Sequence, residues 1–249
     1  YSTNMIANES FLSSATLRDN VVANARSLGY LPTSARSATS KTSFLFTLSQ
    51  DDFPAGYPLS IEILPGPIFI TATGQSNYTF NIVDAQSAPV SSLGECNFTD
   101  VTVYEGFYLT AEFTVDKSNF NQKFILQNQN IDSSTIRVEV QENPSEQLNS
   151  FYEQANNLVD VTSTSRVYWL EEVDSEYYQL TFGDGLFGRE LRDGAKIFVS
   201  YVQSGGPAAN GIQGINNFNF VSPNVFTSTG VKIPSAATTT AVSVSEGGA

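Results

Sequence analysis

Histidine is absent from this 249-residue sequence, and cysteine, methionine and tryptophan each occur only once. The absence of histidine removes the commonest general base and the commonest metal ligand of proteins. The single cysteine, Cys96, excludes an internal disulfide and a cysteine-based zinc site, and it is compatible with assembly in a reducing cytosol. The sequence therefore lacks the usual residues for acid–base catalysis and for transition-metal binding.

Charged residues are also scarce, at 15% of the chain, compared with roughly 25% in an average soluble protein. Only 12 lysines and arginines face 25 acidic residues, which gives a net charge of −13. Nucleic acids and anionic membrane surfaces attract clustered cations, whereas the basic residues here are scattered. No apolar run approaches the roughly 18 residues of a transmembrane helix. The composition thus excludes nucleic acid and membrane as expected partners.

The residues that are abundant favour β structure. Hydrophobic residues make up 41% and aromatic residues 12% of the chain, as in a folded protein. Valine, isoleucine, phenylalanine and tyrosine suit strands, while asparagine, serine, threonine and glutamine supply the polarity. The expected fold class is α+β, mainly β. It consists of an N-terminal helical hairpin followed by two antiparallel β regions, sandwich-like or barrel-like, that are joined by a short helix.

Residues 1–30 form the region with the clearest helical periodicity. Leu17, Val21 and Ala25 fall on one helical face, and Gly29 and Pro32 are typical of a helix end. Such a hairpin could be a small satellite core or a docking element covered by a partner, and the two uses remain equally open. In the docking alternative, the residues expected at the subunit interface are Met5, Ile6, Phe11, Leu12, Leu17, Val21, Ala25 and Leu28.

The rest of the chain divides by its turn signals. Residues 31–41 are polar and rich in small side chains, which indicates a linker, and residues 42–142 contain alternating runs expected in a first β domain. Residues 143–222 are expected to hold a short amphipathic helix, within 143–160, and a second β domain. Residues 223–249 are expected to be an extended linker to a further C-terminal domain. Since the sequence begins at Tyr1 and ends on a linker-like run, we expect a part of a longer protein.

The stretch Tyr178–Val202 predicts a stiff β-hairpin with two tight turns. Asp-Gly pairs favour turns because glycine adopts positive φ at no steric cost. A phosphate-binding loop is the less favoured alternative, because the following helix and the Lys-Ser/Thr pair are missing. The residues expected to shape this turn are Gly183, Asp184, Gly185, Gly188 and Gly194, with the aspartate acting in turn stability rather than in chemistry.

Other chemical sites find weak support. Glu171, Glu172, Asp174 and Glu176, with Asp184, could offer oxygen ligands to calcium, but their spacing matches no EF-hand loop and a solvated turn is favoured. The adjacent pair Glu171 and Glu172 would point to opposite faces of a strand, which argues against a glycosidase pair. The sequence has no Gly-x-Ser-x-Gly elbow. We therefore expect no catalytic residues, no metal, no cofactor and no enzymatic activity.

Three stretches together resemble one protein family. They are NMIANESFL, ATLRDNVV and ARSLGYLPTSAR within residues 4–36, then LPGPIF with YTF within 64–80, and finally FGDGLFGR, DG, VSY and ANG within 182–211. The third stretch is the most specific. In these residues the sequence is similar to the baseplate J-like family, the baseplate wedge proteins of contractile-tailed (myovirus) bacteriophages.

This resemblance implies a structural subunit of a tail baseplate wedge, which joins wedges into the ring around the hub and relays the change that triggers sheath contraction. The implied partners are a second copy of the chain, other wedge subunits, neighbouring wedges, and the hub and sheath-initiating proteins. Its implied location is the virion tail, after assembly in the host cytoplasm. The family chain takes two positions in each wedge, so its linkers must tolerate different domain angles, for which residues 31–41 and 223–249 are suited.

A rival interpretation is a carbohydrate-binding or receptor-binding tail module. Such a module needs exposed aromatic platforms, and Trp169 with Tyr168, Tyr177 and Tyr178 is the candidate cluster. Packing of these rings in a β core is the alternative use of the same residues.

Overall fold

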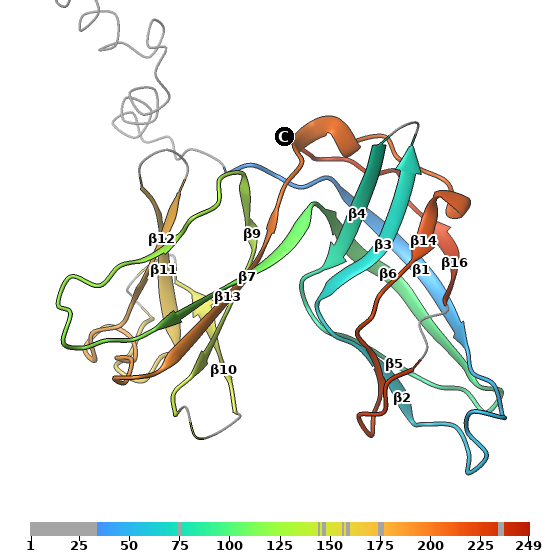
Figure 1. Ribbon diagram of the computed structural model, residues 1–249, viewed down its shortest axis with the longest axis horizontal. Helices are drawn as coiled ribbons and strands as arrows, with labels where there is room; N and C mark the ends of the chain where they lie inside the picture. The colour runs from blue at the N-terminus through green and yellow to red at the C-terminus, as the bar shows by residue number, and fades with distance from the viewer. Residues whose placement is uncertain are drawn as a thin grey trace, which may run out of the picture.

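The computed structural model describes residues 34–73, 76–143, 145, 148–155, 157, 160–173, 177–233 and 237–249. Within them the chain forms sixteen strands and two short 3₁₀ helices, η2 (Gly206–Ala209) and η3 (Ile215–Asn217), and no α-helix. The strands build two nearly closed, barrel-like sheets and one small sheet (Figure 1). The expectation of a mainly β protein is confirmed, whereas the helical hairpin expected at 1–30 lies outside the described residues.

The first barrel consists of a six-stranded and a three-stranded antiparallel sheet. In spatial order the larger sheet contains β14 (Phe218–Phe220), β3 (Gly66–Thr73), β4 (Ser76–Ile82), β6 (Glu95–Glu105), β1 (Thr39–Thr47) and β16 (Ala237–Val242). Its two edges meet where the Thr239 hydroxyl donates to the Phe218 carbonyl at 2.9 Å. The small sheet orders β15 (Val225–Thr227), β2 (Ser60–Ile63) and β5 (Gln86–Pro89), and its Ile61, Ile63 and Val225 join the same core.

Phenylalanine fills the core of the first barrel. Phe44, Phe46 and Leu48 occupy alternate positions in and just after β1, and all three side chains are buried. The Phe44 ring stacks on Phe98 at a centroid distance of 5.0 Å and meets three further rings edge-on or tilted. Aromatic pairs in such geometries add to the free energy gained by burial. The rings of this cluster are Phe44, Phe46, Phe69, Phe80, Phe98, Phe218 and Phe220.

The second barrel is a single seven-stranded sheet. Its order is β7 (Phe107–Thr114), β13 (Lys196–Gln203), β9 (Ile131–Gln141), β10 (Ser150–Gln154), β11 (Val167–Glu172), β12 (Tyr178–Phe182) and β8 (Phe124–Leu126). Only β10 and β11 pair in parallel within the described residues. The edges β7 and β8 approach each other at the Phe113 and Phe124 rings, whose centroids are 5.7 Å apart.

The short helix expected within 143–160 is wrong for its described centre, because Ser150–Gln154 is strand β10. There Phe151 is exposed and Tyr152 is buried, as the alternation of a strand requires. Pairing with β9 and β11 on both sides overrides the helical spacing of the apolar residues.

The sheets also cross the domain boundaries expected from the sequence. Strands β7 to β9, from 107 to 141, belong to the second barrel, so a first β domain of 42–142 does not match the sheets. The expected linker at 31–41 overlaps β1, which begins at Thr39. The segment 223–249 supplies β15 and β16 to the first barrel and is not an extended linker. Alternation reveals a strand but not its partner, so these long-range pairings left no local signal.

The predicted hairpin at Tyr178–Val202 is wrong as well. Strand β12 pairs with β11 and β8, whereas β13 pairs with β7 and β9, so the two strands are not neighbours. The Gly-Asp-Gly stretch instead lies in the connection that runs between two separate positions of the barrel (Figure 1).

Candidate assembly surfaces

The eight residues expected at a subunit interface lie in 1–33, outside the described residues, so they stay a prediction. The features that the structure does describe are the Gly-Asp-Gly loop, an aromatic recess beside it, and the junction between the barrels. The sequence predicted a structural role for the glycines of the loop and a solvated turn for the acidic residues. It gave no prediction for the ion pair at the junction.

The Gly-Asp-Gly loop is a compact turn closed by its own backbone. The Asp184 carboxylate oxygen Oδ1 accepts hydrogen bonds from the amides of Leu186 (2.9 Å) and Phe187 (2.8 Å). These bonds lower the pKa of Asp184, the one from Phe187 having the larger effect. The Gly185 amide donates to the Gly188 carbonyl at 3.1 Å. Asp184 thus caps the turn as an ionised carboxylate.

Two glycines let the ends of this loop touch. A Cβ on Gly183 would lie 2.2 Å from the carbonyl carbon of Gly188, which no side chain could tolerate. Gly188 has φ +81°, and its amide donates to the Thr162 carbonyl at 3.1 Å. Gly194 forms a separate turn with φ +74° and open space around it. The first two glycines therefore serve a close backbone approach, and the third serves a left-handed conformation.

The loop presents apolar side chains to solvent. Leu186 is 75% and Phe187 is 50% exposed. Phe187 lines a recess of about 670 Å³ beside β11 and β12, which we call the Trp169 recess, and Leu186 precedes it in the chain. Its lining consists of Asn157, Trp169, Glu171, Thr181, Phe182, Asp184 and Phe187.

The aromatic cluster considered for a carbohydrate platform is not assembled on this surface. Tyr168 and Tyr178 are 2% and 8% exposed and belong to the core of the second barrel. Trp169 alternates with Tyr168 on β11 and lies on the opposite face, partly buried. The predicted cluster therefore splits, and Trp169 is grouped with Phe187, a residue that the sequence did not single out.

The acidic residues of this region are only partly described, since Asp174 and Glu176 lie outside the described residues. Glu171 is exposed and Glu172 is half-buried on β11. Among the residues that the structure describes, no three histidine, cysteine, aspartate or glutamate side chains come close enough together to hold a metal ion.

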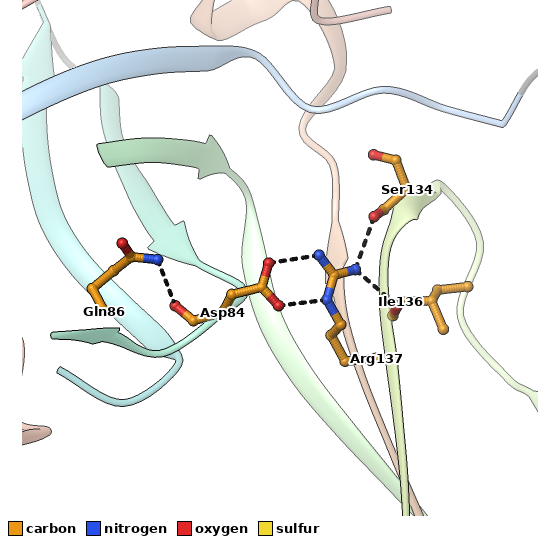
Figure 2. Close-up of polar contacts among 5 residues, drawn as sticks. All are labelled: Asp84, Gln86, Ser134, Ile136 and Arg137. Carbon is orange, nitrogen blue, oxygen red and sulfur yellow. Dashed lines mark hydrogen bonds and ion pairs between the residues drawn. The ribbon is translucent and has the colours of Figure 1, made fainter. Parts of the chain in front are cut away.

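The junction between the barrels is held by a bidentate ion pair. Asp84, which follows β4 of the first barrel, forms an ion pair with Arg137 of β9 in the second barrel (Figure 2). Arg137 Nε lies 2.6 Å from Oδ1, and its second terminal nitrogen lies 2.7 Å from Oδ2. The side-chain bond from Arg137 lowers the pKa of Asp84, and the bond to Asp84 raises the pKa of Arg137. The remaining guanidinium nitrogen donates to the carbonyls of Ser134 and Ile136, so the fork is fully oriented.

A second set of links joins the segment before β1 to the second barrel. The Ser37 amide donates to Asp132 Oδ2 at 2.9 Å, and Asp132 is only 3% exposed. The hydroxyls of Ser34 and Ser133 lie 2.9 Å apart, and the Ser204 hydroxyl donates to the Arg36 carbonyl at 2.8 Å. These hydrogen bonds fix residues 34–37 against the second barrel.

The chain itself crosses the junction where β6 continues into β7 at Gly106. This glycine has φ +134°, and a Cβ there would lie 2.2 Å from the Gln203 carbonyl oxygen. Beside it, the Gly205 amide donates to Glu105 Oε2 at 3.2 Å. Glu105 is 5% exposed, and desolvation raises its pKa. The crossing strand, a buried carboxyl and two glycines are packed against one another at this point.

The junction can hold the two barrels at a defined angle through polar contacts rather than through a shared apolar core. The sequence did contain one signal for it, because the pair Glu105-Gly106 predicts a bend inside a long alternating run. Asp84 and Arg137 gave no signal, since 53 residues separate them.

Among the described residues, no helix has both the length and the apolar character that crossing a membrane requires.

Comparison with known proteins gives one informative match. The sequence matches no protein-family model. It is similar to the "Baseplate wedge protein gp6" of Enterobacteria phage T4, with 26% identity over 225 residues that cover 84% of this chain. The chain spans about a third (32%) of that relative's length. At this identity the similarity indicates distant homology.

Proposed function

The chain is a distant homologue of a phage baseplate wedge protein, and on that premise we propose that it is a structural subunit of a tail baseplate wedge. In this role it joins wedges into the ring around the hub and relays the change that triggers sheath contraction. The observation that carries the proposal is the extent of the match. The matched region covers 84% of the chain, and neither barrel alone contains that share of the residues, so the similarity extends over both barrels. The proposed location is the virion tail.

The junction suits a subunit that occupies two positions in one wedge. The segments 31–41 and 223–249 were the expected sites at which the angle between domains adjusts. However, the described part of segment 31–41 and much of segment 223–249 are in strands or are hydrogen-bonded. We propose that the adjustment occurs at Gly106 and at Ser204–Gly206, because the chain crosses between the barrels there, and that it breaks hydrogen bonds such as the one from the Gly205 amide to Glu105. Polar links such as the Asp84–Arg137 pair can exchange partners with water at small free-energy cost, unlike an apolar core.

The contacts that build the wedge are proposed to lie in the N-terminal region. Each large apolar side chain of that set would contribute about 1.5–3 kcal/mol when fully buried against a partner. The partners proposed are a second copy of the chain and other wedge subunits, with neighbouring wedges, the hub and the sheath-initiating proteins in the finished ring.

The test is co-expression with the other wedge subunits of the same phage, followed by co-purification. The Leu17→Asp and Val21→Asp double variant is expected to lose the wedge complex while the barrels stay folded by circular dichroism. A matched control is Asp19→Asn with Arg26→Gln, on the opposite face of the predicted helix, which should co-purify normally. Co-purification that survives the Leu17 and Val21 changes would refute the docking role.

A structural role also predicts an absence of turnover. In a peptidoglycan-clearing assay the purified chain should give no clearing above buffer. Activity that is lost on Glu171→Gln would overturn the structural proposal in favour of a hydrolase.

A further inference from the structure

The Trp169 recess has a chemical character that its role in folding does not require. Leu186 and Phe187 leave most or half of their surface in water, although hydrophobic burial would favour covering them. They sit on a loop that Asp184 and the Gly183–Gly188 contact hold in one shape. A rigid loop that holds exposed apolar side chains beside a hollow is typical of an interaction surface.

The charge of the recess is of one sign. Glu171 and Asp184 are both in its lining, and no lysine or arginine is. Among the described residues the exposed Glu171 side chain makes no hydrogen bond or ion pair. Asp184 uses Oδ1 for the two loop amides, which leaves Oδ2 without a described partner. The aromatic rings of Trp169 and Phe187 belong to the same lining.

We propose that the Trp169 recess binds an arginine or lysine side chain, flanked by apolar residues, from a segment of a partner protein. The cation would lie on the Trp169 ring, where the negative face of the indole attracts it, and within reach of Glu171 and Asp184. Leu186 and Phe187 would cover the apolar flanks. Because this chain has 25 acidic and 12 basic residues, the cationic segment fits a different protein better than a second copy.

The inference rests on the proposed wedge function in one respect: that function makes the partner protein another baseplate subunit. A sugar is the rival ligand, since aromatic rings and carboxylates also serve glycans. The lining favours a cation, because its two charged groups are both anionic and no lysine or arginine of the lining neutralises them.

Trp169 is the only tryptophan of the chain, so its fluorescence reports on this recess directly. The probe is acetyl-Leu-Arg-Leu-amide, titrated into the millimolar range, and the control probe is the citrulline analogue, which has the same shape without the charge. We expect a saturable change in emission with the arginine peptide and none with citrulline. Glu171→Gln should weaken binding about fivefold, as for one partly exposed ion pair.

The matched control is Glu62→Gln, which removes an exposed carboxylate from β2 of the first barrel and should leave the titration unchanged. An equal response to both peptides, or none to either, would overturn the proposal. Saturation by N-acetylglucosamine instead would make the recess a sugar site. The titration needs no wedge partner, so its failure is distinguishable from a failure of wedge assembly.

Discussion

The two barrels differ in where they place apolar and polar groups. The first barrel encloses a cluster of phenylalanine rings in direct contact. The second buries four tyrosines, Tyr152, Tyr168, Tyr178 and Tyr201, and holds Leu186 and Phe187 in solvent. Burial raises the pKa of Tyr168 to about 12, and Tyr201 donates to Asn128 at 2.7 Å. The difference lies in the cores, since the first barrel packs phenylalanine rings against one another and the second buries tyrosines that carry polar hydroxyl groups.

The largest effect is expected in the phenylalanine core. Phe44→Ala removes a fully buried ring that contacts four others, and should lower the free energy of unfolding by about 3–5 kcal/mol. Urea denaturation measures the change. The matched control is Phe120→Ala, a ring 97% exposed in the second barrel, for which we expect a change within about 0.5 kcal/mol. Equal effects at both sites would break the contrast between core and surface.

The next largest effect separates two roles of glycine in the second barrel. Gly183→Ala forces a Cβ into the Gly188 backbone and should cost about 1–3 kcal/mol, with loss of the loop shape. Gly194→Ala meets open space and pays only for its positive φ, about 1 kcal/mol. Thermal unfolding of both variants gives the comparison, and Trp169 fluorescence reports the loop. A Gly183→Ala protein with wild-type emission and stability would refute the close approach.

The junction should respond to pH through Glu105. Its pKa is raised in the folded state, so its contribution to stability is present below the ordinary glutamate pKa and is lost as pH rises through the raised value. Glu105→Gln should therefore flatten the pH profile of stability just above the ordinary glutamate pKa, where one proton changes stability by at most about 1.4 kcal/mol per pH unit. Urea titrations at several pH values measure this. If the stability of the variant changes with pH in the same way as that of the wild type, Glu105 is not the cause of the pH dependence.

The smallest effect is expected for the Asp84–Arg137 pair, whose side chains are 58% and 35% exposed. A double-mutant cycle with Asp84→Asn and Arg137→Gln should give a coupling of about 0.2–1 kcal/mol. The folded pKa of Asp84 is lowered, so this contribution is present above the ordinary aspartate pKa and is lost as pH falls through the lowered value. Small-angle scattering should show more variable barrel separation in the double variant. If the cycle gives no coupling free energy and the scattering does not change, the Asp84–Arg137 pair does not hold the barrels together.

Local pattern predicted much of the β content but little of its arrangement. The alternation at Phe44 and Phe46 and that at Ile197 and Val199 correspond to buried strand faces. The Asp-Gly pair at 184–185 occupies a tight turn, as its preference for positive φ implies. The error at Ser150–Gln154 arose because apolar residues at 148, 151 and 152 fit a helical spacing, and only pairing with β9 and β11 decides between helix and strand.

The candidate sites were predictable to different degrees. The Gly-Asp-Gly residues were singled out from the sequence, but as the tip of a hairpin rather than as a loop that borders the Trp169 recess. Trp169 was predicted to form a carbohydrate-binding platform together with Tyr168, but the Tyr168 side chain faces the interior of the barrel. Phe187 joins Trp169 only because Gly183 and Gly188 fold the loop back against β11.

By itself the sequence determined the mainly β character, the positions of several strands and turns, and the distant kinship with a phage baseplate wedge protein. These follow from side-chain alternation, from glycine at positive φ, and from residue identity, all of which are local. Only the tertiary structure decided that the C-terminal strands return to the first barrel, that β12 and β13 are not neighbours, and that Asp84 meets Arg137. The physical reason is that every strand offers the same backbone hydrogen bonds, so the choice of partner depends on how whole side-chain surfaces pack.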